Sequence, residues 1–301
     1  MILIVGIKLI GNDLIILLIF KNNGYQNEGS IEEMRGLKGK VAVVTGGSRG
    51  IGRACVQRLL EEEVKVLYNG RNPSTGEKTM KEFQEKFGAE NVLFIAGDME
   101  NEEFCIKTIA TAIEKFGKLD YLLNNAFPFT AKALDATRED WVHTMLAGPI
   151  AYATMIQNYV KFRGKDTPGS IVNMSSVSAH IAQPNRWTYN SAKGAVKQLT
   201  RCAAMDLAPN VRVNTISPSW VWTDEVEKAT RGEGREKWEP VWGRFQLIRR
   251  LEEPEEIAAC VVFLLSDDAS VVTGVDLYAD GGYLAMGSEG LGDTSSFAGT
   301  D

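Results

Sequence analysis

Apolar residues follow two alternating patterns from residue 39 onward. Near-continuous apolar runs of strand length cover residues 41–47, 64–70, 91–97, 119–125, 169–176, 211–217 and 275–282. They lack the strict alternation of a half-exposed strand, which indicates strands that are covered on both faces of a parallel sheet. Amphipathic stretches of helical length, such as 53–63 and 102–117, lie between them. This order predicts an α/β fold with a doubly wound, Rossmann-type parallel sheet in a single domain.

The strand and helix pattern is uninterrupted from 38 to 285, so we assign this range to one domain. Residues 1–37 are interpreted as an N-terminal extension, and residues 286–301, rich in Gly, Ser and Thr, as a flexible C-terminal tail. The first twenty residues are strongly apolar, but polar and charged residues interrupt them and lower their propensity to span a membrane. We therefore expect a cytoplasmic protein, with membrane association through residues 1–20 as the alternative.

The composition excludes several classes of function. Lys and Arg number 33 against 39 Asp and Glu, a net charge of −6, which argues against a nucleic-acid partner. The four cysteines are far apart in sequence and form no CxxC pair, so they are interpreted as thiols in a reducing compartment, and no metal site is predicted. Neither of the two histidines, His143 and His180, stands in a nucleophile motif.

A glycine-rich turn follows the first strand of the pattern directly. The segment TGGSRGIGRA places Gly46, Gly50 and Gly52 between that strand and the next helix. Glycines permit a tight turn and let backbone N–H groups approach a pyrophosphate at the positive end of a helix. A plain strand-to-helix turn is the alternative, but the position within a repeating α/β pattern favours nucleotide binding.

The segment WTYNSAKGAV places Tyr189 four residues before Lys193, on one face of a predicted helix. A tyrosine with a pKa near ~10 is a poor acid or base at neutral pH unless a cation lowers that value, and Lys193 supplies a charge. Ser176 follows a predicted strand, where parallel sheets present ligand sites. Without this context, the pair would be interpreted as an ordinary phenol beside a lysine.

The chain resembles the short-chain dehydrogenase/reductase family, classical type, over residues 38 to about 285. Four segments carry the resemblance: TGGSRGIG, NNAF, the set Ser176, Tyr189 and Lys193, and PSWVWT. The resemblance implies that Tyr189 exchanges a proton with a carbonyl or alcohol oxygen, which Ser176 polarises, during hydride transfer. It also implies that Lys193 holds the nicotinamide ribose, whereas the adjacent Ser175 is interpreted as structural.

The resemblance also implies a set of cofactor-binding residues, namely Gly46, Ser48, Arg49, Gly50, Ile51, Gly52, Arg71, Asp98, Met99, Asn125, Ala126, Tyr189, Lys193, Pro218, Val221 and Thr223. The second strand ends with Gly70 and Arg71, where an NAD enzyme usually presents a carboxylate to the ribose 2′-hydroxyl. Together with Arg49, this favours NADP(H) over NAD(H). Asp98 could also cap the helix that begins at Glu102.

Two positions depart from the family pattern. Ser219 stands where the family usually has glycine, which is tolerable if its φ is negative. The family also places an asparagine on the helix after NNAG, but no asparagine occurs from 126 to 157, and Met145 or a gap takes its place. His143 is the nearest substitute, although it reads more simply as an exposed helix residue. The sequence therefore lacks the asparagine that the resemblance implies for a proton relay.

The segment 223–250 is expected to determine the substrate. Aromatic residues are candidate walls of an apolar pocket, with core packing as the alternative for each: Trp187, Trp220, Trp222, Trp238, Trp242 and Phe245. They suggest a hydrophobic ketone or secondary alcohol as the substrate. The alternatives are a catalytically weak NADP-binding regulatory protein and an enoyl reductase of the same family. The resemblance implies a homotetramer or homodimer built on the helices at 140–163 and 188–208.

Overall fold

The computed structural model describes residues 7–10, 13–16, 34–164 and 166–291, which belong to two compact units, 1–33 and 34–301. In the first unit, β1 (Ile7–Ile10) pairs with β2 (Asp13–Ile16) as an antiparallel hairpin. The rest of the predicted extension before Met34, and the predicted tail beyond residue 291, lie outside the described residues. Within the described part of the chain, no helix is long and apolar enough to cross a membrane.

The second unit is built on a seven-stranded sheet whose strands all run parallel. Its spatial order is β5 (Val92–Ala96), β4 (Lys65–Gly70), β3 (Val41–Val44), β6 (Tyr121–Asn124), β7 (Gly169–Met174), β8 (Val211–Pro218) and β9 (Asp276–Ala279). The order reverses between β3 and β6, where a doubly wound sheet opens a crevice for a ligand. The predicted fold class is confirmed.

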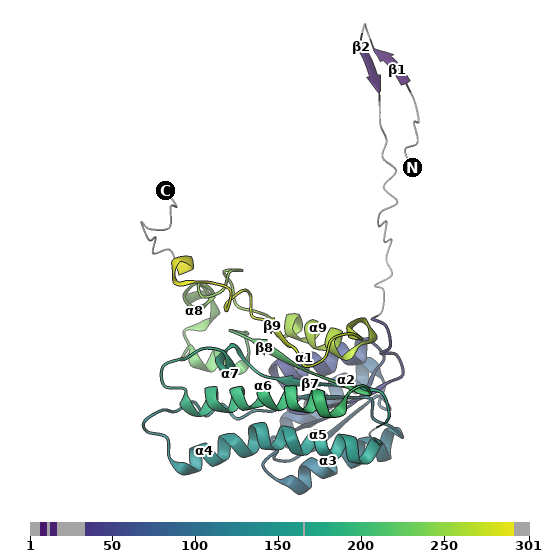
Figure 1. The fold of residues 1–301 in the computed structure, drawn as a ribbon, viewed down its shortest axis with the longest axis vertical. Helices are drawn as coiled ribbons and strands as arrows, with labels where there is room; N and C mark the ends of the chain where they lie inside the picture. Colours follow the sequence, from purple (N-terminus) through teal and green to yellow (C-terminus); the bar gives the residue numbers. More distant parts are fainter. Residues whose placement is uncertain (1–6, 11–12, 17–33, 165, 292–301) are drawn as a thin grey trace. The chain divides into compact units, whose positions relative to one another are not determined.

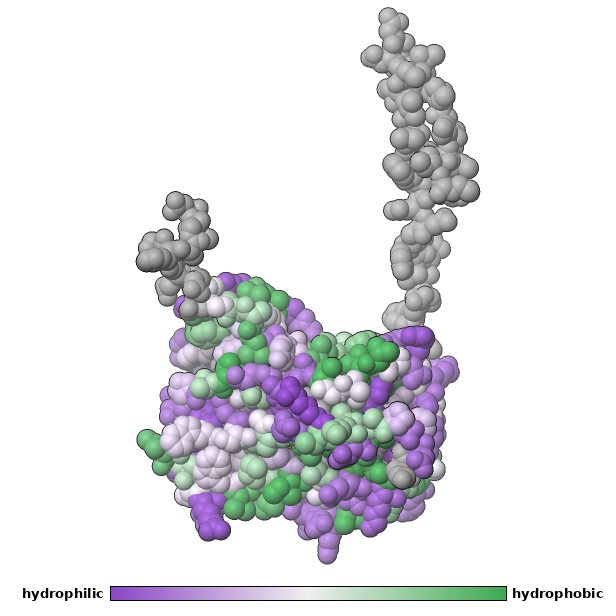
Figure 2. Space-filling view, in the orientation of Figure 1, coloured by the Kyte–Doolittle hydropathy of each residue, from purple (hydrophilic) through white to green (hydrophobic). Residues whose placement is uncertain are grey.

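Helices cover both faces of this sheet (Figure 1). One apolar layer joins the sheet to α1 (Gly50–Glu61), α2 (Pro73–Phe87) and α9 (Pro254–Leu265). The other joins it to α3 (Glu102–Phe116), α5 (Ala151–Arg163) and α6 (Trp187–Leu207). Two short helices, α7 (Asp224–Ala229) and α8 (Gly234–Gly243), follow β8. The visible surface of the domain mixes polar residues with separate apolar groups (Figure 2).

The helix predicted at 140–163 is interrupted. The chain forms α4 (Arg138–Met145), then a π-helical turn η1 (Leu146–Ile150), and only then α5. Pro149 lies inside η1, and Gly148 has φ −102° and ψ −111°, outside the helical region. Proline removes a backbone donor and crowds the preceding turn, so the helix cannot continue regularly through this point.

The compact unit begins at Met34, four residues before the boundary that the apolar pattern suggests. Leu37 is fully buried in the core, and Arg35 pairs with Asp268 at 2.5 Å. The Tyr121 hydroxyl donates to the carbonyl of Gly36 at 2.7 Å. The contacts of these residues with distant elements could not be read from a local pattern.

Candidate active site

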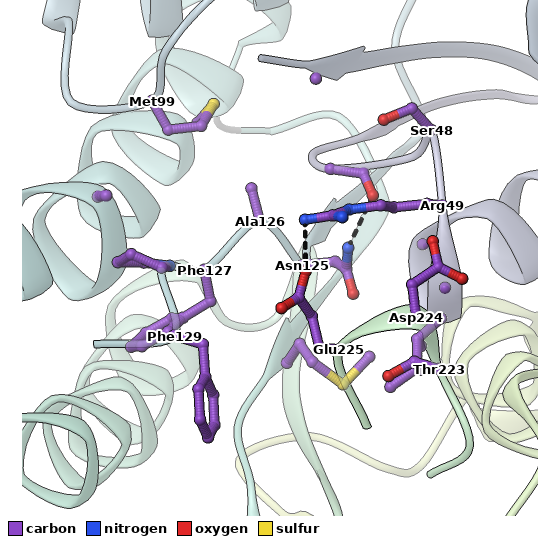
Figure 3. Close-up of a pocket in the computed structure, with 18 of the residues that line it drawn as sticks. Ser48, Arg49, Met99, Asn125, Ala126, Phe127, Phe129, Thr223, Asp224 and Glu225 are labelled. Carbon is purple, nitrogen blue, oxygen red and sulfur yellow. Dashed lines mark hydrogen bonds and ion pairs between the residues drawn. The ribbon is translucent and has the colours of Figure 1, made fainter. Parts of the chain in front are cut away.

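A cleft of about 520 Å³ opens at the carboxyl ends of the strands, on both sides of the reversal between β3 and β6. Its lining includes all the residues predicted for the cofactor and the chemistry, which are Gly46, Ser48, Arg49, Gly50, Ile51, Gly52, Arg71, Asp98, Met99, Asn125, Ala126, Ser176, Tyr189, Lys193, Pro218, Val221 and Thr223. Figure 3 shows part of this cleft, where the glycine turn faces the segments after β6 and β8. The parallel sheet brings together residues that lie far apart in sequence.

The glycine turn is built for close backbone approach. Gly46 and Gly50 have φ values of +69° and +55°, a region that side chains disfavour. A Cβ on Gly52 would lie 2.2 Å from the carbonyl oxygen of Gly46. Helix α1 begins at Gly50, and Arg49 at its N-cap makes no side-chain cap bond. The first N–H groups of α1 therefore face the cleft and suit the diphosphate of a dinucleotide.

The two arginines predicted for a 2′-phosphate differ in their surroundings. The guanidinium of Arg49 forms an ion pair with Glu225 at 2.7 Å, across the cleft from the glycine turn (Figure 3). Arg71 lines the same cleft, is exposed, and has no ion-pair partner among the described residues. Gly70 packs against Ser48, since a Cβ there would lie 2.6 Å from Ser48 Oγ, and a larger residue would require the serine side chain to move. Arg71 is thus the cation that remains available to a phosphate.

Asn125 and Ala126, directly after β6, form hydrogen bonds with Thr45, directly after β3. Their backbone N–H groups both donate to the Thr45 hydroxyl, at 2.9 and 3.0 Å, and the Asn125 amide donates to the Thr45 carbonyl at 2.9 Å. Asp98 does not cap α3, because Asn101 is the N-cap and its side chain accepts from the N–H of Phe104 at 2.9 Å. The Asp98 carboxylate accepts from the N–H of Glu100 at 3.0 Å.

Tyr189 lies on the first turn of α6, with its ring packed between two phenylalanines. Its ring centroid is 5.5 Å from that of Phe127 and 5.0 Å from that of Phe129. Burial raises the pKa of Tyr189 above its usual value of 10, while a hydrogen bond with Ser176 and the charge of Arg186 act in the opposite direction. Ser176 is 8% exposed and lies at the end of β7, as predicted.

Lys193 is buried and faces an aromatic ring. Its ammonium donates to the Met174 carbonyl at 2.9 Å and lies 3.7 Å from the centroid of Phe127, against 5.7 Å for Tyr189. Burial lowers the pKa of Lys193 to about 7. In this structure the cation that lowers the pKa of Tyr189 is Arg186, and an effect of Lys193 on Tyr189 stays a prediction. The Ser175 hydroxyl donates to the Lys193 carbonyl at 3.2 Å and fixes its turn of helix.

Phe127 is the functional feature that sequence reasoning passed over. It is the last residue of NNAF, where the family segment has glycine, and its ring lies against the Lys193 ammonium in the lining of the cleft. The π-helical turn makes room for this ring, since a Cβ on Gly148 would lie 2.6 Å from Phe127 Cε2. The mismatch between NNAF and NNAG was the signal that could have revealed it.

Neither residue suggested for the missing asparagine reaches the cleft. Met145 and His143 are absent from its lining, to which this helical region contributes Ala147. Nδ1 of His143 instead makes a hydrogen bond with the carboxylate of Glu100. Ser219 is not among the residues with positive φ, as the tolerance of a serine at this position requires. Its hydroxyl donates to Glu252 at 2.7 Å.

The prediction that tryptophans form the wall of the cleft is corrected by the structure. Trp238 stacks on Trp242 with ring centroids 4.7 Å apart, and Trp242 stacks on Trp220 at 5.1 Å. Indoles that cover one another's faces bury apolar area without a ligand. None of the predicted aromatic residues lines the cleft, although Trp187 lines a second cavity. The apolar wall of the cleft near Tyr189 comes from other residues, namely Phe127, Pro128, Phe129, Ala147 and Met174.

Known proteins share this architecture and much of the sequence. A family model described as enoyl-(acyl carrier protein) reductase matches residues 46–284. An NADP-dependent (R)-specific alcohol dehydrogenase from Lentilactobacillus kefiri is 34% identical over 260 residues, covering 83% of this chain and 98% of that protein. Glucose 1-dehydrogenase 2 from Bacillus subtilis is 32% identical over 262 residues, covering 82% and 95%.

Structural similarity extends over the same range. The ligand-free aldohexose dehydrogenase from Thermoplasma acidophilum matches with a TM-score of 0.77 at 30% identity, covering 85% of this chain and 98% of that one. The parallel sheet, the glycine turn at its reversal and these similarities lead to one conclusion. The chain belongs to the short-chain dehydrogenase/reductase family of nicotinamide-dependent oxidoreductases.

Proposed function

We propose that this protein interconverts a hydrophobic ketone and a secondary alcohol with NADP(H) as cofactor and Tyr189 as the acid or base. The supporting observation is that Ser176, Tyr189 and Lys193 line one cleft with the glycine turn. The apolar residues beside Tyr189, among them Phe129 and Met174, favour an apolar substrate body.

The chain's own residues supply the proton chemistry. The Ser176 hydroxyl donates to the substrate oxygen and polarises it, and Tyr189 gives that oxygen its phenolic proton in the reductive direction. Burial keeps Tyr189 protonated, which suits it to act as the acid. Nicotinamide, when bound, exchanges a hydride with the carbon of the same carbonyl group. Lys193 holds the ribose beside it, and Phe127 restricts where that ammonium can reach.

NADP(H) is favoured by charge at the end of β4. Arg71 is exposed and has no acidic partner among the described residues, and the strand ends in Gly70 rather than in a carboxylate. A 2′-phosphate attracts such a cation, whereas a 2′-hydroxyl needs an acceptor there. The Lentilactobacillus kefiri relative is NADP-dependent by name, which agrees with this choice.

Tyr189→Phe tests the proposal. It removes only the hydroxyl, so NADPH should still bind, which a change in the fluorescence of NADPH would show. Turnover of a panel of aryl and alkyl ketones should fall by about 10²-fold or more. Tyr278→Phe is the control, because this tyrosine is 50% exposed on β9 and outside the cleft lining. Turnover that survives in Tyr189→Phe would refute the assigned acid.

Two alternatives are separated by the same experiment. The description of the matching family model favours an enoyl reductase, which would reduce an α,β-unsaturated thioester and leave the ketones untouched. The departure at the family's asparagine favours a weakly active NADP-binding regulatory protein, which would bind NADPH and turn over neither class of substrate. Both substrate classes therefore belong in the panel.

We also propose a cytoplasmic homodimer or homotetramer. The four cysteines are free thiols, which suits a reducing compartment. Apolar side chains remain exposed on the helices expected to form the interface, including Met205 at 82% on α6 and Phe162 at 41% on α5. Light scattering on the purified protein measures the oligomeric state, and a monomer at micromolar concentration contradicts this part of the proposal.

A further inference from the structure

We propose that Arg186 binds a carboxylate on the substrate, so that the enzyme acts on apolar oxo acids or hydroxy acids. This inference rests on the proposed function and specifies its substrate class. It concerns a residue that the family motifs do not include, at the N-terminal boundary of α6.

Arg186 contacts two aromatic rings, one of which lines the cleft beside Tyr189. Its Cζ is 5.7 Å from the ring centroid of Phe129 and 5.7 Å from that of Trp220. Phe129 packs directly on the ring of Tyr189 and lines the cleft (Figure 3). Arg186 and Tyr189 are three residues apart at the start of one helix, so their side chains are neighbours. The guanidinium is thereby held close to the proposed acid.

The guanidinium has no anionic partner. Among the residues described, no ion pair and no hydrogen bond involves its nitrogens. Other arginines of the domain do form ion pairs: Arg235 pairs with Glu239 and Glu253, and Arg250 pairs with Glu256. Contact with an aromatic ring does not use the N–H donors of a guanidinium, which lie in its plane, where a carboxylate can accept two hydrogen bonds.

The local sequence disfavours an arginine at this position. Arg186 is the N-cap of α6 and makes no side-chain cap bond, although such positions favour Ser, Thr, Asp or Asn. A cation there also opposes the positive end of the helix dipole. Asn185 before it has a left-handed φ of +58°, which turns the chain into the helix. Residues that depart from local preferences are often found at functional sites.

Arg186 also lines a second cavity, beside the first turn of α6. It has a volume of about 460 Å³, and Arg186 lines it together with polar side chains such as Ser178, Gln183 and Asn190. No aspartate or glutamate is in its lining, so no carboxylate of the protein competes with the substrate. Asp276 lies behind His180, which donates to it through Nε2 at 2.7 Å, and the ammonium of Lys197 donates to Nδ1 of the same ring at 3.0 Å, so the charge of Asp276 has a cation nearby. The electrostatic environment therefore favours an anion.

Steady-state kinetics with matched substrates tests the proposal. Phenyl oxo acids of increasing chain length, such as 4-oxo-4-phenylbutanoate, are compared with their methyl esters, which keep the shape and remove the charge. We expect the wild type to prefer the acids. Arg186→Gln should lower kcat/KM for the acids by about 10²-fold, mainly through KM, and change it for the esters by less than threefold. Arg186→Lys should retain part of the preference.

The controls separate this inference from the proposed function. Arg201→Gln, at an exposed arginine of the same helix, should change neither substrate class. Tyr189→Phe should abolish turnover of both the acids and the esters. If the wild type shows no preference for the acids but its turnover still depends on Tyr189, the inference fails and the proposed function stands. Preference of the wild type for the esters overturns the inference. An equal loss of kcat/KM for acids and esters in Arg186→Gln, with a shifted pH profile, also overturns it, because Arg186 would then act on Tyr189 and not on the substrate.

Calorimetry covers the case in which none of these ketones is turned over. The corresponding hydroxy acid, 4-hydroxy-4-phenylbutanoate, is titrated into the NADP⁺-loaded enzyme. We expect binding to the wild type that Arg186→Gln weakens by at least tenfold, whereas equal affinity, or no binding to either protein, contradicts the inference.

Discussion

Replacing Glu252 by glutamine should remove a pH dependence of stability that its burial creates. Glu252 is 3% exposed, beside the loop that contributes Ser219 to the cleft. Its carboxylate accepts hydrogen bonds from the hydroxyl and the N–H of Ser219, at 2.7 and 3.3 Å. Burial raises the pKa of Glu252 from 4.5 to about 7, the Ser219 bonds oppose this shift, and the charge of Asp280 adds to it.

The magnitude follows from linkage between protonation and folding. Between pH 4.5 and about 7, the folded state holds a proton at Glu252 that the unfolded chain has released. The stabilisation is thus fully present below pH 4.5 and is lost as the pH rises through 7. Each unit of pKa difference corresponds to about 1.4 kcal/mol, so this residue accounts for about 3 kcal/mol across the window.

Chemical denaturation from pH 4.5 to 8.5 measures the effect for wild type and Glu252→Gln. The difference between the two free energies of unfolding cancels the other titrating groups. As the pH rises from 4.5 to 8, the free energy of unfolding of the variant should increase by about 3 kcal/mol relative to that of the wild type. Glu236→Gln, at an exposed glutamate on α8, is the control and should give a flat difference. Parallel stability curves for wild type and Glu252→Gln would refute the reasoning.

The remaining predictions concern the cofactor and the packing of Phe127. Arg71→Ala should weaken NADPH binding by about tenfold and leave NADH binding unchanged, because it removes the cation available to the 2′-phosphate; fluorescence titration measures both, and equal losses would contradict the assignment. Gly148→Ala should destabilise the fold by about 1–3 kcal/mol in urea, since its methyl group would meet the Phe127 ring at 2.6 Å. Phe127→Leu should restore most of that loss in the double variant, and additive losses would argue against the contact.

Local pattern was sufficient for the framework of this protein. Near-continuous apolar runs identify strands covered on both faces, because the burial of a strand is recorded in its own residues. The glycine turn and the four-residue spacing of Tyr189 and Lys193 are also local, since each lies within a single turn or helix. These features sufficed for the α/β class and for a cleft in which the predicted residues meet.

The tertiary structure alone decided which charges and rings face each other in that cleft. The pairing of Arg49 with Glu225, the stacking of Trp220 on Trp242 and the contacts of Arg186 with Phe129 and Trp220 all join different segments of the chain. Their partners depend on where loops after different strands converge, which no periodicity encodes. The pKa values of Tyr189 and Lys193 belong to the same class, because burial and neighbouring charges set them only once the chain is folded.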